Sequence, residues 1–162
     1  MSATETDTEA EPREGTEDYH AQAEAAVRVF SYRKPDMTEV PRAARANLGR
    51  TDIVRGVVQV WKKGGENNLH YHAHTDSVWF VLKGKVRFYG PGDKLIGEFG
   101  PHEGVIMPRG ARYWFENLED DDLEILQVVS YAEKNGKDTG RTDVAPLKFP
   151  IGESVKVEAV KG

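Results

Sequence analysis

The chain has 162 residues, of which 38% are hydrophobic, and this suffices for one modest core in a single domain with arms. It contains no cysteine, which excludes disulfides, thiolate metal sites and a cysteine nucleophile. No apolar run approaches the ~18 residues of a membrane span, and the first residues do not form a signal peptide, so we expect a cytoplasmic protein without a membrane partner.

The formal net charge of −5 is distributed unevenly along the chain. Residues 1–24 hold eight acidic residues and one basic residue, whereas the other 138 residues hold 19 acidic and 21 basic ones. A polar, acidic segment with few large apolar groups cannot bury a core, so we expect residues 1–24 to form a disordered tail. The rest of the chain is close to neutral, which argues against nucleic acid as a partner.

The segment 25–50 is transitional and is expected to be an arm or linker. Its first part, AAVRVFSY (25–32), fits a short strand or an extended arm. Its second part is interrupted by Pro41 and Gly49 and is expected to be an irregular connection.

Residues 51–132 show a β pattern throughout, with short apolar or alternating runs divided by Gly, Pro, Asn and Asp. The runs cover residues 54–62, 69–72, 77–82, 85–89, 94–99, 104–108, 112–117 and 123–131. Runs of this kind without a helical stretch predict an all-β sandwich or barrel, whose interior is lined by alternate side chains. Residues 133–162 form a turn-rich tail, in which SVKVEAVK (154–161) alternates like an edge strand or an arm.

Three of the five histidines lie in the run LHYHAHTD, at positions 70, 72 and 74. In an extended strand alternate residues share a face, so His70, His72 and His74 point the same way as long as the strand continues. Imidazole is the commonest metal ligand at neutral pH, and Asp76 lies four residues past His72 as a plausible carboxylate ligand. The alternative is a polar strand end whose imidazoles only form hydrogen bonds.

Two stretches around this run resemble the two conserved motifs of the cupin family. GGENNLHYHAHTDSVWFVLKG (64–84) resembles the first motif at Gly64, His70, His72 and Gly84. HEGVIMPRGARYWFEN (102–117) is similar to the second motif at Pro108, Gly110 and Asn117. The resemblance spans about residues 51–130 and implies a cupin double-stranded β-helix, a jelly-roll barrel, with flexible N- and C-terminal arms. It also suggests a homodimer that pairs through edge strands such as VRVFSY or SVKVEAVK.

In metal-binding cupins the ion is typically held by two histidines and a glutamate of the first motif and a histidine of the second. The resemblance assigns the first two roles to His70 and His72. Ser77 stands at the glutamate position, with Asp76 one residue earlier, and Tyr113 stands at the position of the last histidine. We therefore expect a divalent iron, nickel, manganese or zinc ion at His70 and His72, completed by Asp76 or by His74. The alternative is a metal-free pocket.

The resemblance places the Tyr113 face of its strand inward, and Trp79 shares the face of Ser77. We therefore predict that Ser77, Trp79 and Tyr113 contact a small-molecule ligand. Tyr113 is also the candidate catalytic acid–base group, because a nearby ion lowers the pKa of a phenol.

These features predict a small-molecule-binding cupin with a divalent metal and an oxidoreductase activity of the dioxygenase type. One alternative is a non-catalytic protein that binds or senses a small ligand. The other is a metal-free isomerase or lyase that uses histidine and tyrosine as an acid–base pair.

Overall fold

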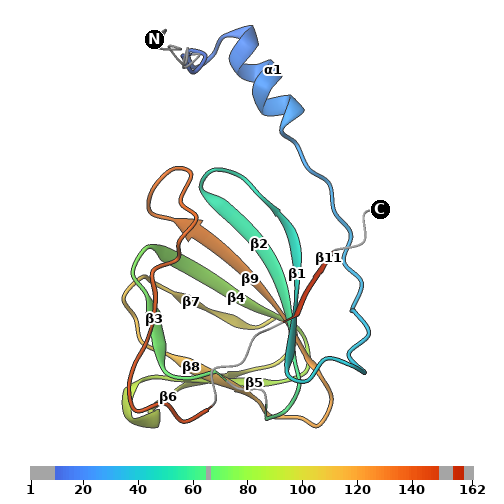
Figure 1. Cartoon of the computed structure of the whole chain (residues 1–162), viewed down its shortest axis with the longest axis vertical. Helices are drawn as coiled ribbons and strands as arrows, with labels where there is room; N and C mark the ends of the chain where they lie inside the picture. Colours follow the sequence, from blue (N-terminus) through green and yellow to red (C-terminus); the bar gives the residue numbers. More distant parts are fainter. Residues whose placement is uncertain (1–9, 65–66, 150–154, 159–162) are drawn as a thin grey trace, which may run out of the picture.

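The computed structural model describes residues 10–64, 67–149 and 155–158, and consists of a β-barrel with one projecting N-terminal helix (Figure 1). The elements in chain order are α1 (Glu17–Ala25), β1 (Ala43–Arg50), β2 (Val54–Trp61), β3 (His70–His72), β4 (Thr75–Lys83), β5 (Val86–Tyr89), the 3-10 turn η1 (Pro91–Asp93), β6 (Leu95–Phe99), β7 (Gly104–Met107), β8 (Trp114–Asn117), β9 (Leu123–Tyr131), β10 (Arg141–Asp143) and β11 (Val155–Glu158).

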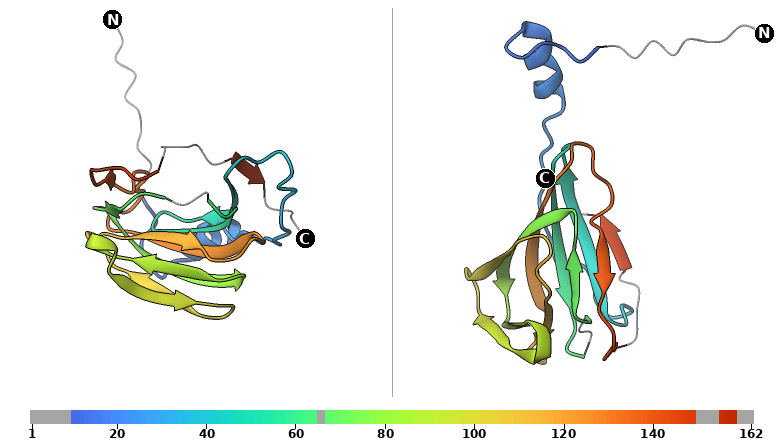
Figure 2. Two further views of the ribbon diagram at one scale, coloured as in Figure 1. Left: turned by 90° about the horizontal axis from the view of Figure 1, so that it is seen from below. Right: turned by 90° about the vertical axis from the view of Figure 1, so that its left-hand side faces the viewer.

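The barrel is built from three sheets. A six-stranded sheet has the order β11-β1-β2-β9-β4-β7, a three-stranded sheet has the order β6-β5-β8, and β10 pairs with β3. The two larger sheets face each other across the core (Figure 2). This architecture confirms the predicted all-β jelly roll, and each of the eight predicted runs overlaps with one of the strands β2 to β9.

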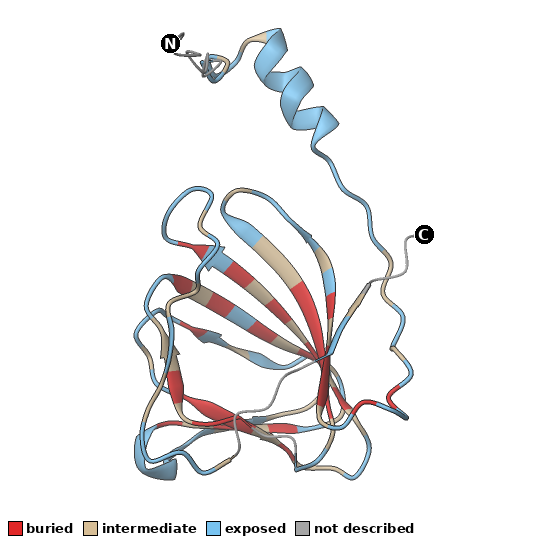
Figure 3. Cartoon of the chain, in the orientation of Figure 1, coloured by how far each residue is buried: buried red, intermediate tan, exposed pale blue. Residues whose placement is uncertain are grey.

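Buried and less buried positions alternate along β4 and β9, as the period of two requires (Figure 3). The inward side chains of β4, β5, β8 and β9 form one core cluster with several aromatic rings. Phe115 lies at its centre, with ring centroids 5.2 Å from both Trp61 and Phe88 and 5.4 Å from Trp79. This packed end of the barrel fixes the positions of the pocket residues described below.

The prediction of an irregular connection before residue 50 is wrong, because Ala43–Arg50 forms strand β1. Three alanines of this strand are buried, at positions 43, 44 and 46. Alanine has a low intrinsic preference for strands, so pairing with β2 and packing on the core decide the conformation here. Strand β11 pairs in parallel with the other edge of β1, so the strand predicted in SVKVEAVK forms over its described part.

Residues 17–25 form helix α1, although the sequence predicted a disordered tail up to residue 24; residues 1–9 lie outside the described residues. The side chain of Thr16 caps the helix by accepting a hydrogen bond from the Tyr19 backbone, and two acidic residues lie in the first turn. The helix buries none of its residues. In the described part of the chain, no helix has the length and apolar character needed to cross a membrane.

Gly104 sits where strand β7 approaches strand β4 most closely. A Cβ atom at this position would lie 1.9 Å from the carbonyl oxygen of Trp79. We therefore expect Gly104→Ala to lower the free energy of unfolding by about 1–3 kcal/mol, because the backbone must shift to admit the methyl group. Urea denaturation measures this loss. Gly100→Ala is the matched control, since its Cβ meets only the Glu103 carboxylate at 3.7 Å; equal losses in both variants would contradict the steric explanation.

Candidate ligand pocket of the barrel

A pocket of about 240 Å³ opens inside the barrel, between the inner faces of the large sheet and strands β3 and β10. The predicted residues that line it are His70, His72, Trp79 and Tyr113. Further polar lining comes from Arg45, Arg55, Gln59, Asn67, Gln127, Lys137, Asp138, Thr139 and Arg141. The pocket therefore combines the predicted motif residues with charged side chains from other parts of the chain.

The floor of the pocket is a chain of hydrogen bonds between side chains of neighbouring strands. The indole Nε1 of Trp61 donates to Oε1 of Gln59 at 2.9 Å, and Nε2 of Gln59 donates to Oε1 of Gln127 at 2.8 Å. Nε2 of Gln127 then donates to the hydroxyl of Ser77 at 3.2 Å. Strand positions bring these side chains together. Gln127 lies on β9 opposite Trp79 of β4, and Gln59 lies two residues before Trp61 on β2, so the side chains of Gln59 and Trp61 share a face. Ser77 is thus buried and held by the floor.

His70 is 1% exposed, and its ring is fixed by the backbone around it. Nδ1 lies 2.7 Å from the carbonyl oxygen of Asn68, which only accepts, so Nδ1 carries the proton and Nε2 is left as an acceptor. An antiparallel bridge joins the backbone of His70 to that of Tyr113 and brings their ring centroids to 4.5 Å. Burial, followed by the positive charge of Arg141, lowers the pKa of His70 to about 3, so the ring is neutral at pH 7.

His72 projects from the same face of β3, with its ring centroid 5.1 Å from that of His70. Its Nδ1 is buried and has no hydrogen-bond partner in the part of the chain that the structure describes. Burial lowers the pKa of His72 to about 4, and the charges of Arg141, Arg45 and Arg55 contribute to the shift. This ring is therefore also neutral at pH 7.

Tyr113 is 1% exposed, and within residues 10–64, 67–149 and 155–158 its hydroxyl has no hydrogen-bond partner of standard geometry. Burial raises the pKa of this phenol, an effect that the nearby Trp79 indole and the charges of Arg141 and Arg45 only partly offset. The indole N–H of Trp79 likewise makes no hydrogen bond of standard geometry. The two groups lie close to each other without a hydrogen bond of standard geometry, and the phenol stays protonated.

Asp76 and His74 lie apart from this pocket. Ser77 faces the barrel interior, so its neighbour Asp76 faces the other way, where it accepts a hydrogen bond from the Arg109 backbone at 2.7 Å. Strand β3 ends at His72, so the alternation that would align His74 stops before it, and His74 is exposed. Of the four expected metal ligands, the structure brings together His70 and His72.

These residues do not fit the metal site of the family. In the described part of the chain, no group of three or more His, Cys, Asp or Glu side chains is placed to hold an ion. The two acidic groups nearest to the pocket are engaged, since Asp143 pairs with Arg141 at 2.7 Å and Asp138 accepts from the Gly140 backbone at 2.8 Å. A divalent ion at this place would have two imidazole ligands and no carboxylate to neutralise its charge, and several cationic side chains would lie beside it.

Comparison with known proteins agrees with this fold. Residues 57–129 match the family model of the cupin domain. The chain contains a cupin domain. An uncharacterized protein of Aquifex aeolicus is 32% identical over 75 residues, a match that covers 46% of this chain and 59% of that protein.

Solved structures similar to this cupin include an uncharacterized conserved Klebsiella pneumoniae protein with a double-stranded beta-helix domain (TM-score 0.57, 20% identity, 75% of this chain and 94% of that one). KdgF from Halomonas sp. has a TM-score of 0.52 at 18% identity, over 64% of this chain and 94% of that chain. An oxalate oxidase in complex with the substrate analogue glycolate has a TM-score of 0.54 at 18% identity, over 69% and 60% of the two chains. At such identities the likeness concerns the fold alone.

The sequence did not identify the arginines of the pocket. Arg55 lies on β2 in the same alternating set as Gln59 and Trp61, so the period of two contained a signal for it. Arg45 lies on β1, opposite Gln59, in a segment where no strand was predicted. Arg141 lies on β10, opposite His72, and only the folded chain brings it there.

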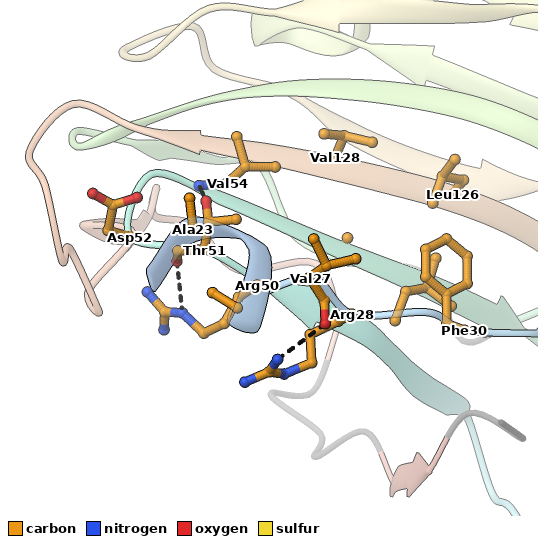
Figure 4. A pocket seen from close by; sticks show the side chains of 14 residues that line it. Ala23, Val27, Arg28, Phe30, Arg50, Thr51, Asp52, Val54, Leu126 and Val128 are labelled. Atoms are coloured by element: carbon orange, nitrogen blue, oxygen red, sulfur yellow. Dashed lines mark hydrogen bonds between the residues drawn. The ribbon is translucent and has the colours of Figure 1, made fainter. Parts of the chain in front are cut away.

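A second hollow, of about 710 Å³, lies outside the cupin barrel beneath the N-terminal arm (residues 26–42). Figure 4 shows Val27 and Phe30 of the arm near Val54, Leu126 and Val128 of the sheet. Val27 and Phe30 remain 68% and 55% exposed, so the arm fills little of this hollow. Its lining is mostly apolar, and its two arginines, Arg28 and Arg50, donate hydrogen bonds to backbone carbonyl groups. We therefore place the candidate site inside the barrel.

Proposed function

We propose that this cupin domain binds a small polar organic molecule inside its barrel, without a resident metal. The observation that carries the proposal is the group of buried polar atoms on the pocket wall that lack hydrogen-bond partners among the described residues: Nε of Arg45, Nε of Arg55, Nδ1 of His72, Nε1 of Trp79 and the hydroxyl of Tyr113. An unsatisfied buried polar group costs about 1–3 kcal/mol. A ligand that supplies the missing hydrogen bonds would explain why several such groups surround one pocket.

The size of the pocket limits the ligand. Sites for drug-sized molecules span about 300–1,000 Å³, and this pocket of about 240 Å³ lies below that range. The ligand is therefore a small metabolite. The aromatic rings of Trp79 and Tyr113 supply apolar contact, and their polar ends orient the molecule.

Binding is better supported than metal-dependent oxidation. A dioxygenase-type reaction at His70 and His72 requires a third protein ligand such as Asp76, which instead contacts Arg109. The expectation of a divalent ion thus rests on the two histidines and the family resemblance. The likeness to oxalate oxidase does not add to it, because it concerns the fold alone.

A metal-free isomerase or lyase is the second candidate. The contact between the rings of His70 and Tyr113 favours it, since an acid–base pair needs two such groups at one pocket. The protonation states weaken it, because burial lowers the pKa of His70 to about 3, which makes it a weak base, and raises the pKa of the Tyr113 phenol, which makes it a weak acid. By contrast, His70 and Tyr113 can form hydrogen bonds to a ligand while both stay neutral.

Thermal unfolding with a panel of small polar metabolites tests the proposal. We expect one or more compounds to raise the Tm of the wild-type protein, and we expect Tyr113→Phe to weaken that shift by removing one ligand contact. Tyr71→Phe is the matched control, because Tyr71 lies on β3 between the two inward histidines and faces the other side. Stabilisation by iron, nickel, manganese or zinc salts alone, lost in a His70→Ala/His72→Ala variant, would favour the metal site instead.

A homodimer remains our proposal for the assembly of the chain. Val27, Val29 and Phe30 of the N-terminal arm are 68%, 76% and 55% exposed, and clustered apolar exposure is typical of surfaces that bind another protein. Strand β11, the other segment considered for exchange, pairs with β1 of its own chain. The arm is accordingly the better candidate for contact with a second copy.

A further inference from the structure

The pocket wall has an excess of positive charge. Arg45, Arg55, Arg141 and Lys137 all line it. The charge of Arg141 is partly compensated by its ion pair with Asp143. Nε of Arg45 and Nε of Arg55 are buried without a hydrogen-bond partner among the residues that the structure describes. The one acidic residue of the described lining, Asp138, accepts from the Gly140 backbone, so neither guanidinium group is paired with a carboxylate.

The environment of Arg45 is unfavourable for a cation. Burial lowers the pKa of Arg45, and the positive charges of Arg141, Arg55 and Arg42 lower it further. A buried guanidinium normally pairs with a carboxylate or a phosphate, whose oxygens match its planar fork of donors. Neither partner is present among the described side chains around Arg45.

The free polar atoms of the wall are mostly hydrogen-bond donors. The guanidinium Nε of Arg45 and Arg55 and the indole Nε1 of Trp79 only donate, and the hydroxyl of Tyr113 donates as well as accepts. The acceptors of Gln59 and Gln127 are already occupied within the floor. A pocket of this kind is complementary to a ligand rich in acceptors.

The arginines reach the pocket from three strands, β1, β2 and β10. The positive potential is thus concentrated on the side of the large sheet and β10, and the aromatic rings of Trp79 and Tyr113 provide an apolar wall. A small molecule with an oxyanion group and a short organic body fits both parts.

We infer that the pocket binds a small organic anion whose oxyanion group, a carboxylate or a phosphate, is held by Arg45 and Arg55. This inference rests on the proposed function, because it names the chemical class of the ligand of the same pocket. Guanidinium groups recognise both oxyanions in the same bidentate manner.

Isothermal titration at low ionic strength with matched pairs of compounds tests the inference. The pairs are acetate and acetamide, malonate and malonamide, succinate and succinamide, and glycerol phosphate and glycerol. We expect the charged member of one or more pairs to bind and its neutral partner to bind at least ~30-fold more weakly, which corresponds to the lower end of the cost of leaving a buried charge unpaired. Carboxylate pairs and the phosphate pair report separately on which oxyanion is preferred.

Substitutions of the two arginines test whether they hold the oxyanion group of the ligand. Arg45→Gln and Arg55→Gln are each expected to weaken binding of the charged compound at least ~30-fold, whereas Arg45→Lys retains the charge and loses less. Arg112→Gln is the matched control, since Arg112 is exposed and precedes Tyr113. Circular dichroism confirms that each variant is folded.

The outcomes separate the inference from the proposed function. Equal affinity for acid and amide, or unchanged binding of the acid by folded Arg45→Gln and Arg55→Gln, overturns the inference and leaves a polar-ligand pocket. Failure of the wild-type protein to bind either member of any pair or any compound of the metabolite panel overturns both.

Discussion

The free energy of unfolding is expected to fall steadily as the pH is lowered from about 6.5 towards 4. The cause is His70, whose pKa is lowered from 6.5 to about 3 in the folded protein by burial. Between these values the unfolded chain takes up a proton that the folded chain refuses, so protonation favours unfolding. The loss amounts to roughly 3 kcal/mol from His70 alone by pH 4, at about 1.4 kcal/mol per pH unit, and the smaller shift of His72 adds to it.

The pH window separates this effect from that of the carboxylates. Hydrogen bonds to Arg109 and Lys148 lower the pKa of Asp76 and Asp93, so the stability that these groups contribute is present above their ordinary value of 3.8 and is lost as the pH falls below it. The histidines act at higher pH. Well above pH 6.5, the ordinary pKa of histidine, both histidines are neutral in the folded and the unfolded chain, and their contribution to stability no longer changes.

Urea denaturation between pH 4 and 8 measures the effect. His70→Gln removes the titrating ring and retains an amide donor for the Asn68 carbonyl, so its stability is expected to change less between pH 6.5 and 4 than that of the wild type. His20→Gln is the control, because His20 lies on the exposed helix α1. A pH profile of His70→Gln that parallels the wild type would show that His70 is not the group responsible.

Much of the barrel could be predicted because the relevant signals are local. Alternating apolar residues and the Gly, Pro and Asp of the turns act over a few positions, and they marked strands β2 to β9. The same alternation, combined with the cupin motifs, placed His70, His72, Trp79 and Tyr113 on the pocket. Parity also contained the reason why Asp76 does not line the pocket, since two adjacent residues of a strand cannot both face inward.

The remaining features depend on contacts between distant parts of the chain. Strand β1 is rich in alanine and is held by β2 and β11, so its own sequence carries little strand signal. Arg45 and Arg141 come from segments outside the predicted barrel and meet only through pairing with β2 and β3. The positive charge of the pocket, which distinguishes an anion site from a metal site, was for this reason not visible in the motifs.

The protein without ligand is expected to become more stable when Arg45 is replaced by methionine. Arg45 is largely buried, its pKa is lowered by burial and by three neighbouring arginines, and no described side chain pairs with it. Replacing buried charged groups by apolar ones of similar size can stabilise a protein by about 1–4 kcal/mol, and we expect a gain on the order of 2 kcal/mol for Arg45→Met. Methionine suits the position, because its unbranched side chain adapts to irregular space.

Urea denaturation of the unliganded proteins measures this gain, with Arg112→Met as the exposed control that is expected to change stability by less than about 0.5 kcal/mol. Loss of stability in Arg45→Met would mean that the guanidinium is satisfied within the folded chain, which would contradict the account of an uncompensated cation. A gain in stability together with a loss of anion binding would show that Arg45 serves ligand binding and not the stability of the fold. The fold then tolerates an unfavourable buried charge in the free state because a ligand neutralises it in the bound state, and the same residue that weakens the empty barrel determines what it binds.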